Sequence, residues 1–278
     1  MTSDVSSSPV AVVTGGARGI GLAIGRWFLA HGQCVALLDI DANTLAQSVA
    51  ALDDPGRLLA LHCDVSDPRR VQSAVEAIEA RFGRIDALVN NAGVAVFKTI
   101  GETTFEEWRH VLSTNLDGAF LCTQACVPAM RRTGGGSIVN IASISGLRAS
   151  TLRVAYGTSK AALIHLTKQQ AVELGTLGIR VNAIAPGPVD TAMAKLVHSV
   201  AIRSDYYDAI PLNRYSTTEE IAEATGFLCS AAAGFINGQV LAVDGGFDAA
   251  GVGLPTLRKN ADHDEAQRQE VQRLGAGV

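Results

Sequence analysis

The architecture of this chain can be inferred from one segment near its N-terminus, Val10-Ala11-Val12-Val13-Thr14-Gly15-Gly16-Ala17-Arg18-Gly19-Ile20-Gly21. Its first four residues form the apolar run of a short buried strand, and the apolar residues after Gly21 recur at helical spacing. Glycines between a strand and a helix allow a tight turn. They also let a phosphate approach the N–H groups and the positive dipole end of the helix. The spacing Gly-x-x-x-Gly-x-Gly is a variant of the usual fingerprint, and its strand–turn–helix context predicts a dinucleotide site.

Short apolar runs alternate with longer helical patterns along the rest of the chain. Runs rich in Val, Ile and Leu, separated by helices, indicate a parallel sheet covered on both faces. We predict one α/β domain with a Rossmann-type doubly wound sheet of about seven parallel strands. The predicted strands are Val10–Val13, Cys34–Asp39, Leu58–Cys63, Ala87–Asn90, Ser137–Ile141, Arg180–Ile184 and Val240–Val243. The predicted helices are Ile20–His31, Ala42–Leu52, Pro68–Phe82, Thr104–Arg131, Arg153–Leu177 and Glu219–Ser230.

Composition separates this domain from the two ends of the chain. Residues 9–250 form the predicted dinucleotide-binding and catalytic domain. Residues 1–8 are a polar N-terminal tail that lacks the basic start and apolar stretch of a signal peptide. Residues 251–278 are a polar extension. It is either a frayed tail or a helix over Asp262–Leu274 that docks on a partner subunit.

The whole-chain composition excludes several classes of protein. The 278 residues carry a formal net charge of −4, which gives no reason to expect nucleic acid binding. No apolar run is long enough to span a membrane, so we expect a cytoplasmic protein. Five cysteines spread over a long chain do not form a disulfide framework, and the six histidines show no metal-ligand spacing. We therefore expect no metal, and cysteines that serve as small apolar core residues.

Tyr156 and Lys160 lie four positions apart, which stacks their side chains on one face of a helix. A phenol has an ordinary pKa of about 10. A nearby positive charge favours the phenolate and lowers that value towards neutral pH. The pair could therefore donate a proton to a ketone oxygen or take one from an alcohol.

Asp39 ends the second predicted strand, 18 residues after Gly21 (39 − 21 = 18). A carboxylate at this offset can accept hydrogen bonds from adenine-ribose hydroxyls, and it repels a 2′-phosphate. Arg18 instead favours NADP, because a basic residue in this turn can hold a 2′-phosphate. Ile40 supplies no second base, so the sequence predicts NAD rather than NADP.

The chain resembles the classical short-chain dehydrogenase/reductase family from about Val10 to Gly246. The matching motifs occur in the order and approximate spacing of that family, and no member of its usual catalytic tetrad is missing. They are Thr14 to Gly21, Asn90-Asn91-Ala92-Gly93, Asn115, Ser143, Tyr156, Lys160 and Pro186-Gly187.

The resemblance implies roles for the tetrad. Ser143, 13 residues before Tyr156 (156 − 143 = 13), orients the substrate oxygen near the phenol. Lys160 holds nicotinamide-ribose hydroxyls and lowers the pKa of Tyr156. Asn115 marks a helix kink whose freed carbonyl holds a water that contacts Lys160. Ser145 is a nearby alternative to Ser143, and either serine alone would be typical of a turn.

The resemblance also implies a set of cofactor-binding residues. Asp64 approaches the adenine amino group and Val65 packs on the ring, although Asp64 could instead cap the next helix. The Val189 backbone and the Thr191 hydroxyl grip the nicotinamide carboxamide, and residues 190–211 form a mobile lid. The full predicted set is Gly15, Arg18, Gly19, Ile20, Gly21, Asp39, Asp64, Val65, Asn91, Ala92, Gly93, Tyr156, Lys160, Pro186, Gly187, Val189 and Thr191.

The predicted activity is hydride transfer between NAD(H) and a secondary alcohol or ketone. An NADPH-dependent β-ketoacyl carrier-protein reductase and a sugar or polyol dehydrogenase are alternatives. A non-catalytic NAD-binding protein is a further alternative that the complete tetrad argues against. Arg148 and Arg153 could form a docking patch or bind a substrate carboxylate or polyol, but we favour ordinary loop solvation for both.

The long helical patterns over Phe105–Met130 and Arg153–Leu177 carry more apolar positions than one face against a sheet needs. The resemblance implies that these helices pair across a two-fold axis, and that the Val240–Val243 region makes a second interface. We therefore expect a homotetramer.

Overall fold

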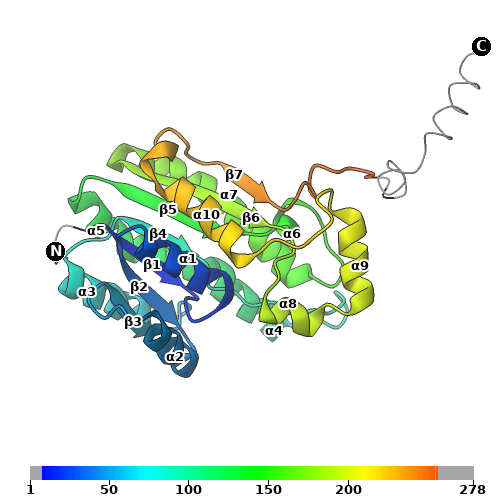
Figure 1. The fold of residues 1–278 in the computed structure, drawn as a ribbon, viewed down its shortest axis with the longest axis horizontal. Helices are drawn as coiled ribbons and strands as arrows, with labels where there is room; N and C mark the ends of the chain where they lie inside the picture. Colours follow the sequence, from blue (N-terminus) through cyan, green and yellow to red (C-terminus); the bar gives the residue numbers. More distant parts are fainter. Residues whose placement is uncertain (1–7, 254, 256–278) are drawn as a thin grey trace, which may run out of the picture.

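The chain folds around one sheet of seven strands, in which every neighbouring pair is parallel (Figure 1). The computed structural model describes residues 8–253 and 255. The strand order is β3-β2-β1-β4-β5-β6-β7, which confirms the predicted doubly wound α/β fold. The strands are β1 (Val10–Thr14), β2 (Cys34–Asp39), β3 (Leu58–His62), β4 (Ala87–Asn90), β5 (Gly136–Ile141), β6 (Ile179–Pro186) and β7 (Val240–Val243).

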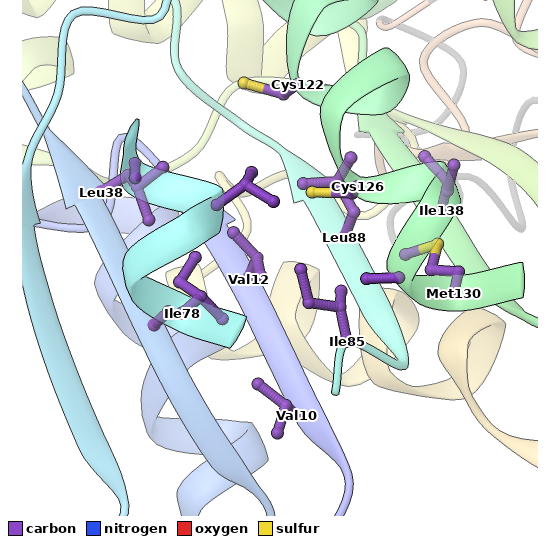
Figure 2. Packing of buried hydrophobic residues seen from close by; sticks show 14 of the residues in the cluster. Val10, Val12, Leu38, Ile78, Ile85, Leu88, Cys122, Cys126, Met130 and Ile138 are labelled. Carbon is purple, nitrogen blue, oxygen red and sulfur yellow. The ribbon is translucent and has the colours of Figure 1, made fainter. Parts of the chain in front are cut away.

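Helices cover both faces because the strands carry apolar side chains on both. In β1, Val10 and Val12 belong to one buried cluster, whereas Ala11 and Val13 belong to the other. The first cluster packs under α3 (Pro68–Phe82) and α5 (Gly118–Arg132), as Figure 2 shows. The second packs under α1 (Gly19–Ala30), α2 (Ala42–Leu52) and α10 (Thr218–Cys229).

The sheet reverses its winding between β1 and β4, which are neighbours although β2 and β3 lie between them in the chain. The crossovers from these two strands therefore leave in opposite directions. A crevice at the carboxyl ends of the strands is the expected ligand site at such a switch point. The predicted turn after Thr14 and the predicted Asn90-Asn91-Ala92-Gly93 segment both lie there.

The predicted continuous helix over Thr104–Arg131 is wrong in one respect. It is divided into α4 (Phe105–Leu112), a π-helical segment over Ser113–Asp117 and α5. The wide turn is centred on Asn115, a poor helix former, and such segments are frequent at functional sites. The resemblance had implied a kink at this position.

Three short helices that were not predicted and two 3₁₀ turns complete the described part of the fold. The unpredicted ones are α6 (Ile144–Leu147), α8 (Ala192–Val197) and α9 (Val200–Ala209). The predicted helix over Arg153–Leu177 is α7 (Val154–Leu174), followed by a 3₁₀ turn over Gly175–Leu177. The 3₁₀ turn over Ala231–Ala233 precedes β7.

Within residues 8–253, no helix has the length and apolar character needed to cross a membrane. The predicted helix over Asp262–Leu274 lies outside the described residues, as does the N-terminal tail up to residue 7.

Candidate active site

The turn between β1 and α1 is fixed against the end of β4 by Asn91. Asn91 Nδ2 donates to the carbonyl oxygens of Thr14 and Gly15 at 2.9 and 3.1 Å. The Thr14 hydroxyl oxygen accepts the backbone N–H groups of Asn91 and Ala92, each at 3.0 Å. A Cβ on Gly21 would collide with the Gly15 carbonyl, so only glycine fits there. Asn91 and Ala92 thus meet the glycine-rich turn at the switch point.

The N-terminus of α1 has the features of a phosphate cradle. Arg18 precedes the helix and makes no side-chain capping hydrogen bond to its first turn, which begins with Gly19 and Ile20. Gly19 has φ +55°, and a Cβ there would find only the Thr191 methyl group within 4 Å, at 3.9 Å. An uncapped helix N-terminus with free space beside it fits the pyrophosphate of a dinucleotide.

Asp39 is buried at the end of β2, with 9 % of its surface exposed. Its Oδ2 accepts the Ala17 N–H at 2.9 Å, and its Oδ1 accepts the Asp41 N–H at 2.9 Å. Each carboxylate oxygen retains a further lone pair for a ribose hydroxyl. The exposed Arg18 guanidinium pairs with the Asp41 carboxylate at 3.3 Å. The charge of Arg18 is therefore already matched by a neighbouring acid.

Asp64 and Val65 follow β3 at the same edge of the sheet. Asp64 Oδ1 accepts the Ser66 N–H and hydroxyl at 2.9 and 2.7 Å. The cap of α3 is Asp67, so the alternative that Asp64 caps this helix is wrong. Val65 is buried, and a Cβ on Gly118 would lie only 2.7 Å from its Cγ2 atom. Val65 is thereby held in place by α5.

Ser143, Tyr156 and Lys160 converge between the end of β5 and the start of α7. Ser143 Oγ accepts the Ser145 N–H at 3.1 Å and is hydrogen-bonded to the Tyr156 side chain. The Lys160 ammonium lies 5.8 Å from the centre of the Tyr156 ring and donates to the Ile141 carbonyl at 2.7 Å. Lys160 is only 4 % exposed. The geometry brings the predicted Ser, Tyr and Lys together. The nearby Ser145 hydroxyl bonds Ser150 instead.

Burial dominates the pKa values of this pair. It raises the pKa of the Tyr156 phenol, while the hydrogen bond to Ser143 and the charge of Arg153 lower it. Burial also lowers the pKa of Lys160 to about 8. The prediction that the pKa of Tyr156 falls towards neutral because of Lys160 is therefore wrong for the protein alone. The desolvation of both groups outweighs their proximity.

Asn115 connects the π-helical segment to both sides of the site. Its Oδ1 accepts the Val94 N–H at 2.8 Å, and its Nδ2 donates to the Val94 carbonyl at 2.9 Å. The same Nδ2 lies 3.0 Å from Ser159 Oγ, which donates to the Tyr156 carbonyl at 2.7 Å. A Cβ on Gly93 would lie 3.3 Å from Asn115 Oδ1 and 3.5 Å from Lys160 Nζ. Sequence reasoning missed Ser159, because nothing in the sequence pairs it with Asn115.

The segment after β6 closes the far side of the crevice. Gly187, which follows Pro186 at the end of β6, donates its N–H to the Val243 carbonyl at 3.0 Å. Val189 is buried and forms a parallel bridge with Ser216. The Thr191 hydroxyl oxygen accepts the Ala194 N–H at 3.1 Å and so caps α8, which leaves its proton for a ligand. The predicted lid contains α8 and α9, and its mobility stays a prediction.

Two arginines before α7 have different environments. Arg148 is exposed, and it donates to the Phe247 carbonyl at 2.7 Å with its guanidinium 4.9 Å from that ring. Arg153 is half-buried, with its guanidinium 4.7 Å from the Phe97 ring centre and 5.7 Å from that of Tyr156. For Arg153 the favoured interpretation as an ordinary solvated loop residue is wrong, because Phe97 and Tyr156 offer it aromatic faces that the sequence does not bring together.

Comparison with known proteins identifies the family. A family model described as enoyl-(acyl carrier protein) reductase matches residues 15–248. The D-threitol dehydrogenase of Mycolicibacterium smegmatis is 40 % identical over 239 residues, which are 86 % of this chain and 92 % of that protein. The 3-oxoacyl-[acyl-carrier-protein] reductase of Chlamydia muridarum is 39 % identical over 85 % of this chain and 96 % of that protein. The NAD-dependent glycerol dehydrogenase of Listeria innocua is 39 % identical over 86 % of this chain and 93 % of that protein.

Solved structures agree with this assignment. Levodione reductase superposes with a TM-score of 0.82 at 36 % identity, covering 87 % of this chain and 98 % of that one. A gluconate 5-dehydrogenase from Burkholderia cenocepacia, in complex with NADP and tartrate, gives a TM-score of 0.83 at 33 % identity and covers 87 % and 96 %. This chain is thus a member of the classical short-chain dehydrogenase/reductase family of oxidoreductases.

Proposed function

We propose that this chain is an NAD-preferring dehydrogenase with Tyr156 as its general acid and base. As a family member it is an oxidoreductase that uses a nicotinamide cofactor and interconverts a secondary alcohol and a ketone. The observation that carries the proposed roles is the cluster of the buried Ser143 and Lys160 with the half-buried Tyr156, beside an uncapped helix N-terminus.

The proposed cofactor site runs along the carboxyl edge of the sheet. The N–H groups at the start of α1 hold the pyrophosphate, and Asp39 accepts the adenine-ribose hydroxyls. Asp64 and Val65 flank the adenine. Lys160 holds the nicotinamide ribose. The remaining contacts come from Gly15, Arg18, Gly19, Ile20, Gly21, Asn91, Ala92, Gly93, Tyr156, Pro186, Gly187, Val189 and Thr191, all at the same edge of the sheet.

A bound nicotinamide supplies or accepts the hydride, and the side chains of this chain handle the proton and the substrate oxygen. In reduction, the Tyr156 O–H donates a proton to the carbonyl oxygen, to which the Ser143 hydroxyl donates a hydrogen bond. Lys160 then returns a proton to Tyr156. Asn115 positions this group through its bonds to Val94 and Ser159. Oxidation of the alcohol reverses each step.

The preference for NAD is supported by Asp39. A 2′-phosphate would lie against a buried carboxylate, which costs free energy through charge repulsion. The Arg18 guanidinium that could compensate is paired with Asp41, and Ile40 offers no charge. The relatives include both an NAD-dependent glycerol dehydrogenase and a gluconate dehydrogenase bound to NADP, so Asp39 decides this proposal.

A carrier-protein reductase is the alternative that one relative suggests. Such an enzyme would need a basic docking patch near the site. Arg148 is bound to Phe247, and Arg153 faces the aromatic rings of the site rather than a docking surface. These two contacts favour a small free substrate over one that is bound to a carrier protein.

A homotetramer is supported by the apolar surface over α5 and α7. A groove of about 600 Å³ lies there, and Phe120 and Val172 are 47 % and 78 % exposed. Apolar side chains grouped in this way suit pairing with a second copy. The apolar lining of this groove comes mainly from Leu116, Phe120, Leu121, Ala162 and Leu166.

We also propose a cytoplasmic location, in keeping with five cysteines that are all free thiols.

A screen of secondary alcohols and polyols, followed by NADH absorbance, tests the proposed function. We expect turnover with NAD in the wild type and its loss in Tyr156→Phe. Turnover that persists unchanged in Tyr156→Phe would contradict the proposed mechanism. Failure of every alcohol and every matching ketone would contradict the proposed activity.

A further inference from the structure

Arg153 lies beside the reacting phenol of Tyr156, but it has no role in the proposed mechanism. It is the residue before α7, and its backbone forms a parallel bridge with Lys98. Its guanidinium lies over the rings of Phe97 and Tyr156, at 4.7 and 5.7 Å. Stacking occupies the faces of a guanidinium and leaves its N–H donors at the edge free for a planar acceptor.

The positive charge of Arg153 has no acidic partner among residues 8–253, unlike those of the nearby Lys98 and Arg203. Lys98 is paired with Glu107 at 2.5 Å, and Arg203 with Asp190 at 2.9 Å. Arg153 is half-buried yet has neither an ion pair nor a side-chain hydrogen bond within the described chain. The N–H donors of a half-buried guanidinium without a protein acceptor are free to bind an anion.

We propose that Arg153 binds a carboxylate of the substrate, so that the preferred substrates are hydroxy acids and keto acids rather than neutral alcohols. This inference rests on the proposed function, because it takes Tyr156 as the group that meets the carbinol or carbonyl oxygen. A carboxylate accepts two parallel N–H bonds from a guanidinium, which fixes its orientation. The substrate would then be held at one end by Arg153 and at the reacting oxygen by Ser143 and Tyr156.

Matched pairs of a hydroxy acid and its methyl ester test this assignment with NAD. Suitable pairs are lactate, 3-hydroxybutanoate and 4-hydroxypentanoate with their esters. For at least one pair we expect the wild type to prefer the acid in kcat/KM by about tenfold or more, as a charged hydrogen bond allows. Arg153→Gln removes the charge and should abolish that preference, mainly through KM. Arg153→Lys should retain part of it.

Arg148→Gln is the matched control, because it removes an arginine from the same loop whose guanidinium is bound to Phe247. We expect the acid-to-ester ratio of this variant to stay that of the wild type. Circular dichroism checks that each variant is folded. Arg153 makes no side-chain cap to α7, so its replacement removes no helix-capping bond.

Calorimetric titration with butanoate and butanamide, in the presence of NAD, separates this inference from the proposed function. We expect the wild type to bind butanoate more tightly than butanamide, and Arg153→Gln to bind both alike. No preference for butanoate, or no preference for any acid in a wild type that oxidises the esters, would overturn the inference alone. Arginine-dependent butanoate binding without any oxidation would uphold it and reject the proposed reaction. Equal losses of kcat/KM on acid and ester in Arg153→Gln would mean that Arg153 acts on Tyr156 rather than on a substrate carboxylate. That result would overturn the inference.

Discussion

The Lys160 ammonium donates to the Ile141 carbonyl at 2.7 Å, which ties the middle of α7 to the last residue of β5. Ser143 follows two residues after Ile141, so the same strand end fixes both the ammonium and the serine hydroxyl. The relative positions of these groups depend on the backbone rather than on a chain of flexible side chains. A site built in this way is pre-organised for its reaction.

Removing the phenol oxygen should abolish proton transfer while leaving the fold intact. For Tyr156→Phe we expect turnover to fall by about 10²-fold or more, the scale of general acid–base catalysis. NAD binding, measured by calorimetry, should persist. Tyr207→Phe is a matched control on α9 and should keep most of the activity. Near-normal turnover in Tyr156→Phe would reject the phenol as the acid and base.

Removing the ammonium should affect two functions at once. Lys160→Ala deletes both the proposed contact to the nicotinamide ribose and the group that returns a proton to Tyr156. We therefore expect weaker NAD binding by calorimetry together with lower kcat. Lys168→Ala, on the same helix, is the control. If only kcat changed and NAD affinity stayed constant, Lys160 would have no part in holding the cofactor.

Neutralising Asp39 should narrow the preference between the two nicotinamide cofactors. Asp39→Asn keeps an acceptor oxygen but removes the charge that repels a 2′-phosphate. We expect the ratio of kcat/KM for NAD over NADP to fall, with Asp53→Asn, an exposed residue after α2, as the control. A wild type that prefers NADP would show that Asp39 does not set the choice.

Alcohol oxidation should accelerate with rising pH, because the phenolate form of Tyr156 is the base. Burial raises the pKa of this phenol and the Ser143 hydrogen bond lowers it, so loss of that bond should raise the pKa further. In Ser143→Ala the pH profile of kcat/KM should therefore move to higher pH, besides falling in height. Ser145→Ala should leave the midpoint where it is. A midpoint shifted to lower pH would contradict the assignment.

Asn115 should contribute to stability as well as to the site. Asn115→Ala removes a buried amide and leaves the half-buried Val94 N–H and carbonyl without their partner. We expect the free energy of unfolding to fall by about 1–3 kcal/mol, the cost of unsatisfied buried groups. Denaturant unfolding measures this, with the exposed Asn43→Ala as the control. Equal stability of the two variants would show that these bonds contribute little.

A charge on the apolar surface over α5 should disturb assembly. Phe120→Asp introduces a carboxylate next to the groove between α5 and α7, and burying it against a second copy would be costly. Light scattering coupled to size exclusion should show a tetramer for the wild type and smaller species for the variant. Leu196→Asp, on the exposed face of α8, is the control. A monodisperse, active wild-type monomer would refute the proposed tetramer.

The sequence predicted the fold well because its signals are local. Val10–Thr14, the turn that follows and the apolar spacing of α1 specify a strand, a turn and a helix without distant information. The tetrad motifs likewise predicted that Ser143 and Tyr156 meet. The pKa of Tyr156 was harder to predict from the sequence, because it depends on how much of the protein covers the phenol.

Contacts between distant residues account for most of what sequence reasoning did not predict. The bond between Asn115 and Ser159 and the stacking of Arg153 on Phe97 join segments 44 and 56 residues apart (159 − 115 = 44; 153 − 97 = 56). The periodic patterns of a sequence do not indicate which distant residues form such contacts. Three short helices were missed because an apolar pattern of only a few turns cannot be separated from a loop.

The π-helical segment over Ser113–Asp117 makes the length of this part of the chain matter as much as its composition. A π turn holds one residue more than the α-helix it interrupts, so deletion of a single residue there would let α4 and α5 run on as one regular helix. If the same residues instead formed a regular α-helix without a deletion, every side chain of α4 would be rotated about the helix axis by about 100° relative to α5, the angle that one residue occupies. The wide turn therefore keeps the faces of α4 and α5 aligned in a chain that carries the extra residue.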